Sequence, residues 1–349
     1  MKISTISFTA NGSALNKKIY DKLIANGEEC FSYAISRYAG EHGLLVKEES
    51  LNDWCKERFH TQDALVFIGA TGIAVRAIAP FVKDKRTDPA VVVIDEMGNY
   101  VISLLAGHIG GANELALTLA KIINAVPVIT TATDVNHTFA VDVFAKKNGL
   151  FISSMPMAKR ISAMVLDHKP IGFCSDYKVI GQVDDVFTNK PCETGVVVSC
   201  NAYRSDFKYT LHLIPPIVHI GIGCRRGMDF SVIEEKILAL LEEKNLSIYS
   251  VCDMSSIDLK KDEEGLLEFS RKYGIEFHTY SAEQLNQANG DFVPSSFVKS
   301  ITGVDNICER ALVYNCQKDN KNIKIIQKKL PADGVTLSLG IEDWSVRFE

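Results

Sequence analysis

Short runs of apolar residues alternate along the chain with stretches whose apolar residues recur at helical spacing. The runs ALVFI (64–68), AVVVI (90–94) and VPVIT (126–130) are nearly continuous and rich in β-branched residues. Such runs are typical of strands that are buried on both faces of a parallel sheet. Before the last of them, ELALTLAKII (114–123) places its leucines and isoleucines on one helix face. Strand, helix and strand in this order predict an α/β layer.

The same alternation returns after Pro215 and Pro216. IVHIGIG (217–223) predicts a strand, followed by a glycine-rich turn and a helix whose start has capping-box spacing at Ser231 and Glu234. The segment between the two regular regions is less periodic. We therefore predict N-terminal and C-terminal three-layer α/β domains joined by a small α/β middle domain. Their predicted bounds are 1–134, 135–215 and 216–349, which suits a chain of 349 residues at about 150 residues per domain.

Composition narrows the class of protein. Hydrophobic residues make up 46% and charged residues 23%, which is typical of a globular chain. With 38 basic and 43 acidic residues the formal net charge is −5, so nucleic acid is not an expected partner. The N-terminus has no apolar signal region, and the longest mostly apolar stretch (64–75) is too short to span a bilayer. We expect a cytoplasmic protein.

The nine cysteines and eight histidines do not form a recognisable metal motif. The cysteine count is odd, no C-x-x-C pair occurs, and the histidines show no ligand spacing. The sequence therefore predicts reduced thiols and no metal held by the protein.

The first candidate site is the sequence GATG (69–72), which follows a predicted strand. Gly69 and Gly72 allow the backbone to approach a ligand, and Thr71 adds a hydroxyl group. Arg76 lies one helical turn further on and is suited to a carboxylate or phosphate. The alternative is a tight β–α turn with an exposed arginine.

The second candidate is LLAGHIGGANELA (104–116), where glycines surround His108. Histidine can act as a general base near neutral pH, so His108 is the best-placed proton carrier, with Glu114 as its orienter or as the base itself. Gly110, Gly111 and Asn113 complete this candidate site. The alternative is a solvent-facing histidine in a flexible loop.

The third candidate is VITTATDVN (128–136), with Thr131 and Asp134 after a predicted strand. Ligand groups in α/β sheets gather at the carboxyl ends of strands. Three predicted strand ends, near residues 68, 106 and 130, carry glycine, threonine or acidic groups, and we expect them to act together. The alternative is that Thr133 or Asp134 only caps the next helix.

The fourth candidate is HIGIGCRRG (219–227). Its glycine spacing departs from the dinucleotide fingerprint, which argues against NAD. Gly223, Arg225 and Arg226, at the mouth of a helix, predict an anion site. Cys224 beside them is expected either to have a lowered pKa or only to pack in the turn.

These segments together resemble a known family. GATGIAVRAIAP, AVVVIDEMGNYVISLLAGHIGGANELA and PVITTATD resemble the N-terminal part of the cobalt-precorrin-5A hydrolases (CbiG type) of the anaerobic cobalamin pathway. GIGCRRG, IDLKKDEEGLLEFSRKYG and PSSFVKSITGVDNICERAL resemble its C-terminal domain, which also resembles a free-standing cobalamin-pathway protein. The match runs in the right order from about residue 50 to 315, and the union of both parts indicates the activity.

The resemblance implies a reaction. Water opens the δ-lactone of cobalt-precorrin-5A, and the two-carbon fragment leaves as acetaldehyde to give cobalt-precorrin-5B. No organic cofactor is implied, and the cobalt belongs to the substrate. A cleft between the first and last domains is expected to hold this polyanionic tetrapyrrole.

The resemblance and the residues together give a set of expected roles. His108 is expected as the base, or as an axial ligand of the substrate cobalt, with Glu114 assisting or replacing it. The amides of Gly110 and Gly111, or the hydroxyls of Thr71 and Thr131, are candidates for the oxyanion. The expected substrate-binding residues are Gly69, Thr71, Gly72, Arg76, Gly110, Gly111, Asn113, Thr131, Asp134, Gly223, Cys224, Arg225 and Arg226.

Two other functions stay open at this point. A carrier of tetrapyrrole intermediates would need the glycine and arginine loops but not His108 or Glu114. A nucleotide-dependent oxidoreductase would need nicotinamide binding at 221–227. The expected partners are the substrate and water, without nucleic acid or membrane; a homodimer, or transient contact with the pathway's methyltransferases, is left open.

Overall fold

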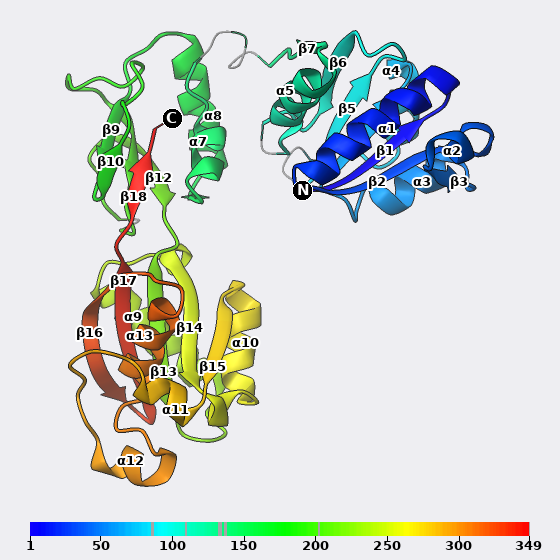
Figure 1. The fold of residues 1–349 in the computed structure, drawn as a ribbon. Helices are drawn as coiled ribbons and strands as arrows, with labels where there is room; N and C mark the ends of the chain where they lie inside the picture. Colours follow the sequence, from blue (N-terminus) through cyan, green and yellow to red (C-terminus); the bar gives the residue numbers. More distant parts are fainter. Residues whose placement is uncertain (85–86, 109, 132–134, 136–137, 202, 349) are drawn as a thin grey trace. The chain divides into compact units, whose positions relative to one another are not determined.

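A computed structural model describes residues 1–349 except 85–86, 109, 132–134, 136–137, 202 and 349. The chain divides into two compact units, Met1–Val143 and Phe144–Glu349 (Figure 1). The elements of the first unit are β1 (Lys2–Ser7), α1 (Ala10–Ala25), β2 (Glu29–Ile35), α2 (Ser36–His42), β3 (Leu45–Lys47), α3 (Leu51–Arg58), β4 (Ala64–Ile68), α4 (Thr71–Ile78), β5 (Ala90–Ile94), β6 (Tyr100–Leu105), α5 (Ala112–Ile123) and β7 (Val126–Val128). Helix α7 (Val141–Lys147) begins in this unit and continues into the next.

One sheet of seven strands, in the order β3-β2-β1-β4-β5-β6-β7, forms the middle layer of the first unit. Every residue of β4 and β5 is buried, as their continuous apolar sequences predict. Apolar residues of α1 and α5 pack on one face, and those of α3 and α4, with Trp54 fully buried, pack on the other. The predicted three-layer α/β domain is confirmed.

The direction of β6 corrects one expectation. Strands β1 to β5 are parallel, but β6 runs antiparallel to β5, and β7 runs parallel to β6. The sheet has two edges formed by the ends of its strands, as distinct from its outer strands β3 and β7. The carboxyl end of β4 lies at one of these edges, and the carboxyl ends of β6 and β7 lie at the opposite one. The expectation that the strand ends near 68, 106 and 130 act together is wrong, because a hairpin between β5 and β6 reverses the chain.

The second unit contains three sheets. Their strands are β8 (Phe151–Ile152), β9 (Gly172–Ser175), β10 (Lys178–Ile180), β11 (Thr194–Val198), β12 (Tyr209–Ile214), β13 (Val218–Cys224), β14 (Val251–Ile257), β15 (Glu276–Tyr280), β16 (Ile323–Ala332), β17 (Val335–Glu342) and β18 (Ser345–Arg347). Their helices are α8 (Met155–Leu166), α9 (Phe230–Glu243), α10 (Glu264–Tyr273), α11 (Ala282–Asn286), α12 (Ser296–Thr302) and α13 (Cys308–Gln317), with short 3-10 turns at Ile248–Ser250 and Asp258–Lys260. The sheet orders are β8-β12-β11-β9, β10-β18 and β15-β14-β13-β17-β16.

The last strand returns to the middle of the chain. β18 pairs in parallel with β10 (Figure 1). The Phe348 ring lies against the rings of Phe144, Phe173 and Phe187. The side chain of Asn148 also bonds to the backbone of Arg347. The end of the chain thus completes the packing of the smaller middle region.

The five-stranded sheet is the core of the C-terminal region. Helices α9 and α10 contribute to the core on one face, and α13 packs against β13, β14 and β17 on the other. Gly221 permits this second packing, because a Cβ at that position would lie 1.8 Å from the carbonyl oxygen of Cys308. The predicted α/β class of the C-terminal domain is confirmed.

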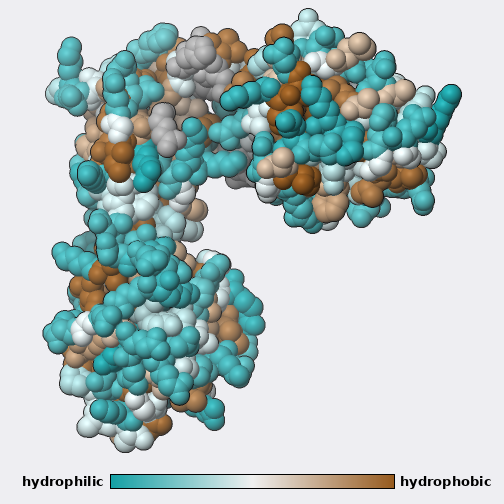
Figure 2. All heavy atoms as spheres, in the orientation of Figure 1, coloured by the Kyte–Doolittle hydropathy of each residue, from teal (hydrophilic) through white to brown (hydrophobic). Residues whose placement is uncertain are grey.

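The surfaces of both units are mainly polar. On the face shown in Figure 2, hydrophilic residues cover most of each unit and divide the hydrophobic areas from one another. None of the helices among the described residues has the length and apolar character needed to cross a membrane.

Candidate functional site

The loop between β6 and α5 folds back tightly on itself. Ala106 has a φ of 55°, and Gly111, the residue before α5, has a φ of 88°, a conformation that favours glycine. A Cβ on Gly110 would lie 2.4 Å from the Cβ of Ala106, so glycine is required there. The Gly111 amide donates to the carbonyl oxygen of His108 at 3.0 Å, which fixes the backbone around the histidine.

His108 faces a carboxylate that the sequence reasoning missed. Its Nδ1 lies 3.7 Å from Oδ2 of Asp142, in the first turn of α7. The two side chains are 16% and 14% exposed, so both are largely shielded from water. An aspartate beside one imidazole nitrogen favours the tautomer in which that nitrogen carries the proton and the other nitrogen is the basic one. Glu114, expected in this role, is exposed on the first turn of α5.

Asn113 connects this loop to the end of β7. Its side chain is buried and donates from Nδ2 to the hydroxyl of Thr131 at 3.0 Å. The side-chain Oδ1 of Asn113 lies so close to Gly107, the neighbour of His108, that a Cβ built on this glycine would be 2.8 Å from it. The backbone amide of Asn113 donates to the Gly107 carbonyl oxygen. His108, Asn113 and Thr131 therefore belong to one edge of the sheet.

The same edge offers groups that can stabilise a developing negative charge. The Thr131 hydroxyl accepts a hydrogen from Asn113 and keeps its own hydrogen to donate. Helix α5 begins after Gly111 without a side-chain cap, and its dipole favours negative charge there, although the amides of Ala112 and Asn113 already donate to the Ala106 and Gly107 carbonyls. The Gly111 amide itself is already used by the His108 carbonyl, which removes it from the expected oxyanion donors. The expected contribution of Asp134 falls outside the described residues.

The GATG segment lies at the opposite edge of this sheet. Helix α4 begins at Thr71, and Arg76 is exposed, with Nη1 3.5 Å from the Gly72 carbonyl oxygen. The Gly69 amide donates to the Ile94 carbonyl at 2.8 Å. Gly69, Thr71, Gly72 and Arg76 can form an anion site of their own, but Thr71 does not share the sheet edge of His108.

The GIGCRRG segment differs from its prediction in two ways. The N-cap of α9 is Asp229, which accepts from the Ser231 amide at 2.8 Å, so the expected capping box at Ser231 is wrong. The backbone amides of Gly227 and Met228, at the mouth of this helix where an anion site was predicted, donate to the carboxylate of Glu263. A buried carboxylate already occupies this part of the turn.

Cys224 is not an activated thiol. Burial raises its pKa to about 11, with Lys260 opposing the shift and Glu263 adding to it. The expectation of a lowered pKa is wrong, because the arginines that follow Cys224 point their charge into solvent as exposed side chains.

The two arginines still mark a cationic surface. Gly223, Cys224 and Arg225 line a cavity of about 480 Å³ together with Lys329 and Asp333, and Arg226, the next residue in the chain, is exposed. A Cβ on Gly223 would have its nearest neighbour at 3.6 Å, so this glycine is not required by packing and leaves the cavity open. Three members of the predicted group, Gly223, Cys224 and Arg225, thus line one cavity, and their role in binding an anion stays a prediction.

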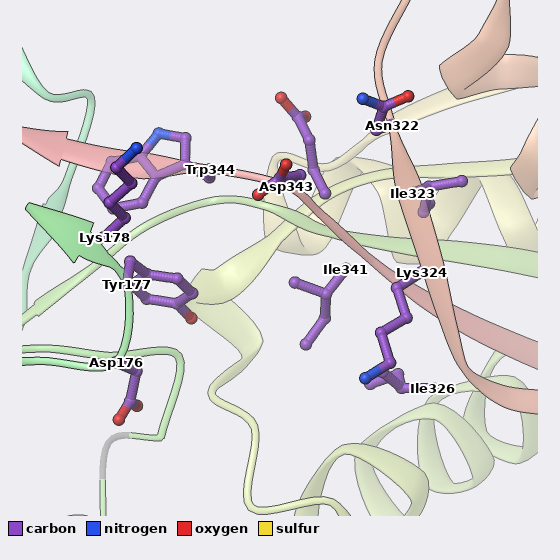
Figure 3. Close-up of a pocket in the computed structure, with 11 residues that line it drawn as sticks. Asp176, Tyr177, Lys178, Asn322, Ile323, Lys324, Ile326, Ile341, Asp343 and Trp344 are labelled. Atoms are coloured by element: carbon purple, nitrogen blue, oxygen red, sulfur yellow. The ribbon is translucent and has the colours of Figure 1, made fainter.

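A second cavity of about 590 Å³ lies in the same unit (Figure 3). Tyr177, Lys178 and Trp344 lie on one side of it, and Ile323, Lys324 and Ile326 on the other (Figure 3). Three acidic residues also line it, Asp176, Glu342 and Asp343. The two lysines nearly balance these three carboxylates, and no sequence motif predicted this cavity.

Comparisons with known proteins cover nearly the whole chain. Three family models match in chain order: Cobalamin synthesis G N-terminal over 53–134, Cobalamin biosynthesis central region over 139–215, and Cobalamin synthesis G C-terminus over 218–340. A cobalt-precorrin-5A hydrolase of Salmonella typhimurium is 35% identical, over 97% of this chain and 97% of its own. One of Priestia megaterium is 36% identical, over 81% of this chain and 79% of its own. A probable cobalt-precorrin-5A hydrolase of Methanocaldococcus jannaschii is 28% identical, over 85% and 90% of the two chains.

Proposed function

The chain belongs to the cobalt-precorrin-5A hydrolase (CbiG) family, and from this premise we propose that it hydrolyses cobalt-precorrin-5A in anaerobic cobalamin biosynthesis. The observation in the structure that supports catalysis, rather than binding alone, is the shielded pair of His108 and Asp142 at 3.7 Å. A carrier would have no need for a histidine held against a carboxylate beside a helix N-terminus.

In the proposed first step, His108 removes a proton from water as the water oxygen attacks the lactone carbonyl. Asp142 orients the ring and stabilises the imidazolium that forms. The Thr131 hydroxyl donates to the tetrahedral oxyanion, and the dipole of α5 adds to its stabilisation. Collapse of this intermediate breaks the ester C–O bond, giving a carboxylate and an alcohol on the two-carbon fragment.

In the second step the alcohol loses its proton and its oxygen becomes the aldehyde oxygen. The carbon–carbon bond to the macrocycle breaks, its electron pair stays with the macrocycle, and a proton returns there. The alcohol proton passes to bulk water, so the sum is one water consumed and one acetaldehyde and one proton released, the proton balancing the charge of the new carboxylate. Imidazolium at His108 is a suitable proton donor for this step, with Glu114 as the alternative acid or base that the sequence suggested.

The proposal places the substrate carboxylates on cationic and amide groups. Arg76, Arg225 and Arg226 are exposed and free to form charge-assisted hydrogen bonds. The glycines of the two N-terminal loops allow close approach of the backbone. We propose that the enzyme works without an organic cofactor, that cobalt enters and leaves with the substrate, and that it acts in the cytoplasm. A homodimer or contact with methyltransferases is a further proposal.

The test is the release of acetaldehyde from cobalt-precorrin-5A, followed through a coupled alcohol dehydrogenase. We expect one acetaldehyde per tetrapyrrole in the presence of the protein and none without it. Tight binding of the tetrapyrrole without acetaldehyde would replace this proposal with the carrier. Stabilisation of the protein by NAD but not by a corrinoid would favour an oxidoreductase.

A further inference from the structure

A second cluster of reactive side chains lies in the C-terminal sheet, away from the carboxyl end of β13 that carries Cys224. We propose that His219, Cys252 and Asp253 form a buried zinc site. Each offers one ligand atom, and these atoms all lie within 4.8 Å of one another. The site does not depend on the proposed hydrolase activity.

A β-bulge brings the three residues together. Val218 pairs with Val251, but the next residue of β13, His219, pairs with Asp253, so Cys252 is the extra residue in β14. Bulges interrupt the alternation of side chains and re-aim them. This is how two consecutive residues, Cys252 and Asp253, both present ligand atoms to the same histidine. The sequence showed no metal spacing because the cluster comes from two strands and an irregularity between them.

The cluster contains buried polar atoms without hydrogen-bond partners. His219 is 1% exposed and Asp253 is 7% exposed. His219 Nδ1 lies 2.9 Å from Asp253 Oδ2, but His219 Nε2 and Asp253 Oδ1 have no hydrogen bond within the described structure. Buried polar atoms are nearly always paired, and among these two Nε2 still faces the Glu342 carboxylate at 3.4 Å, so Asp253 Oδ1 is the atom that marks the place for a further ligand. A metal ion bound to the carboxylate and the imidazole satisfies both groups.

The charges around the cluster balance when a divalent ion is included. Lys321 is 2.9 Å from Glu342 and neutralises it, while Glu342 also lies 3.4 Å from His219 Nε2. Neutral His219 with ionised Cys252 and Asp253 then leaves two negative charges, which one Zn²⁺ cancels. Burial raises the pKa of the Cys252 thiol to about 11, so the ion must displace its proton. The buried Cys316 thiol has its pKa raised to about 12 and adds no charge.

The chemistry of the three ligand atoms favours zinc over other divalent cations. Nitrogen, sulfur and carboxylate oxygen are typical zinc ligands, with Zn–N near 2.0 Å and Zn–S about 2.3 Å. With Nδ1 as the ligand atom, the Glu342 carboxylate faces the other nitrogen, Nε2, at 3.4 Å, as outer-shell partners of zinc-bound histidines do. Glu342, which faces the histidine, also lines the 590 Å³ cavity, whose wall carries Asp176 and Asp343 together with Lys178 and Lys324. The ion would tie β13 to β14 at the edge where both strands begin.

The competing arrangement is an ion pair without metal, in which a protonated His219 bridges Asp253 and Glu342. A calorimetric titration of chelator-treated full-length protein with Zn²⁺ alone distinguishes the zinc site from the metal-free ion pair. We expect one zinc per chain, and a loss of affinity of about 100-fold or more in Cys252→Ser, which keeps the side chain's size. Asp253→Asn is expected to weaken binding as well. The matched control is Cys174→Ser. Cys174 is also partly buried but lies in β9, outside the cluster, so this variant should bind zinc as tightly as the wild type.

Substitution with Co²⁺ supplies a second readout, because a thiolate ligand gives a charge-transfer absorption that a serine does not. We expect this band in the wild type and in Cys174→Ser, and its absence in Cys252→Ser. Circular dichroism shows that each variant is folded. If the wild type binds no zinc, or if Cys252→Ser binds zinc as tightly as the wild type, the cluster is an ion pair only and the proposal is wrong.

Discussion

The Asp142 carboxylate lies 3.7 Å from Nδ1 of His108, joining the start of α7 to the loop after β6. Both side chains are largely shielded, so the carboxylate acts on the imidazole in a medium less polar than water. This pair replaces the expected contact of His108 with Glu114 as the geometric basis of a general base.

The pair predicts how two substitutions affect turnover. We expect His108→Ala and Asp142→Asn each to lower kcat for acetaldehyde release by about 100-fold or more, because a general base contributes that much and the asparagine no longer stabilises the imidazolium. Substrate binding, measured by fluorescence quenching, should change little. Asp21→Asn, an exposed carboxylate of α1, is the control. Full turnover in Asp142→Asn would assign the orienting role to another group.

The arginines of the C-terminal region predict an effect on KM rather than on kcat. Arg225 and Arg226 are exposed beside the 480 Å³ cavity and do not belong to the edge that carries His108. We expect the double change to alanine to raise KM about tenfold, since each charge-assisted hydrogen bond to a substrate carboxylate is lost in ground and transition states alike. Arg271→Ala, an exposed arginine on α10, serves as the comparison. An unchanged KM would remove this surface from the binding site.

The packing of α13 on β13 predicts a large loss of stability in Gly221→Ala. The added Cβ would meet the Cys308 carbonyl oxygen at 1.8 Å, so the helix or the strand must move. We expect the free energy of unfolding to fall by about 3 kcal/mol, measured by urea denaturation. Gly223→Ala, two residues along the same strand, should cost much less, because its nearest neighbour would be 3.6 Å away. Equal losses in the two variants would contradict the close approach.

The buried carboxylate of Glu263 predicts a loss of stability in acid. Burial opposes its ionisation, but hydrogen bonds from Lys260 and from the Gly227 and Met228 amides outweigh burial and lower its pKa from 4.5. A lowered folded-state pKa stabilises the protein above the unfolded-state value, and this stabilisation is lost as pH falls through the folded-state pKa.

We therefore expect Glu263→Gln to be less stable than the wild type at pH 7 and to lose less further stability below about pH 4.5, where the wild-type carboxylate takes up its proton. Urea denaturation across this pH range checks both statements. Glu264→Gln removes the neighbouring exposed carboxylate and should follow the wild type. A constant difference between Glu263→Gln and the wild type down to pH 3 would show that the carboxylate does not titrate as described.

The amino-acid sequence determined the strands and helices where burial dictates the pattern. β4 and β5 have the predicted bounds 64–68 and 90–94, and α5 covers the predicted 114–123, because a continuous apolar run or a helical stripe has one stable environment. The ordered motifs also identified the family, which the comparisons confirm. These properties are local, or are sums of local features.

Tertiary structure decided which of these segments meet. Hydrophobic periodicity carries no strand direction, so the reversal at β6 that separates GATG from His108 could not be derived from the pattern. The partner of His108 is Asp142, on an element that folds back from further along the chain, and a bulge places Cys252 and Asp253 together beside His219. A site is a set of distances between residues remote in sequence, and those distances are fixed by strand pairing and packing across the whole sheet.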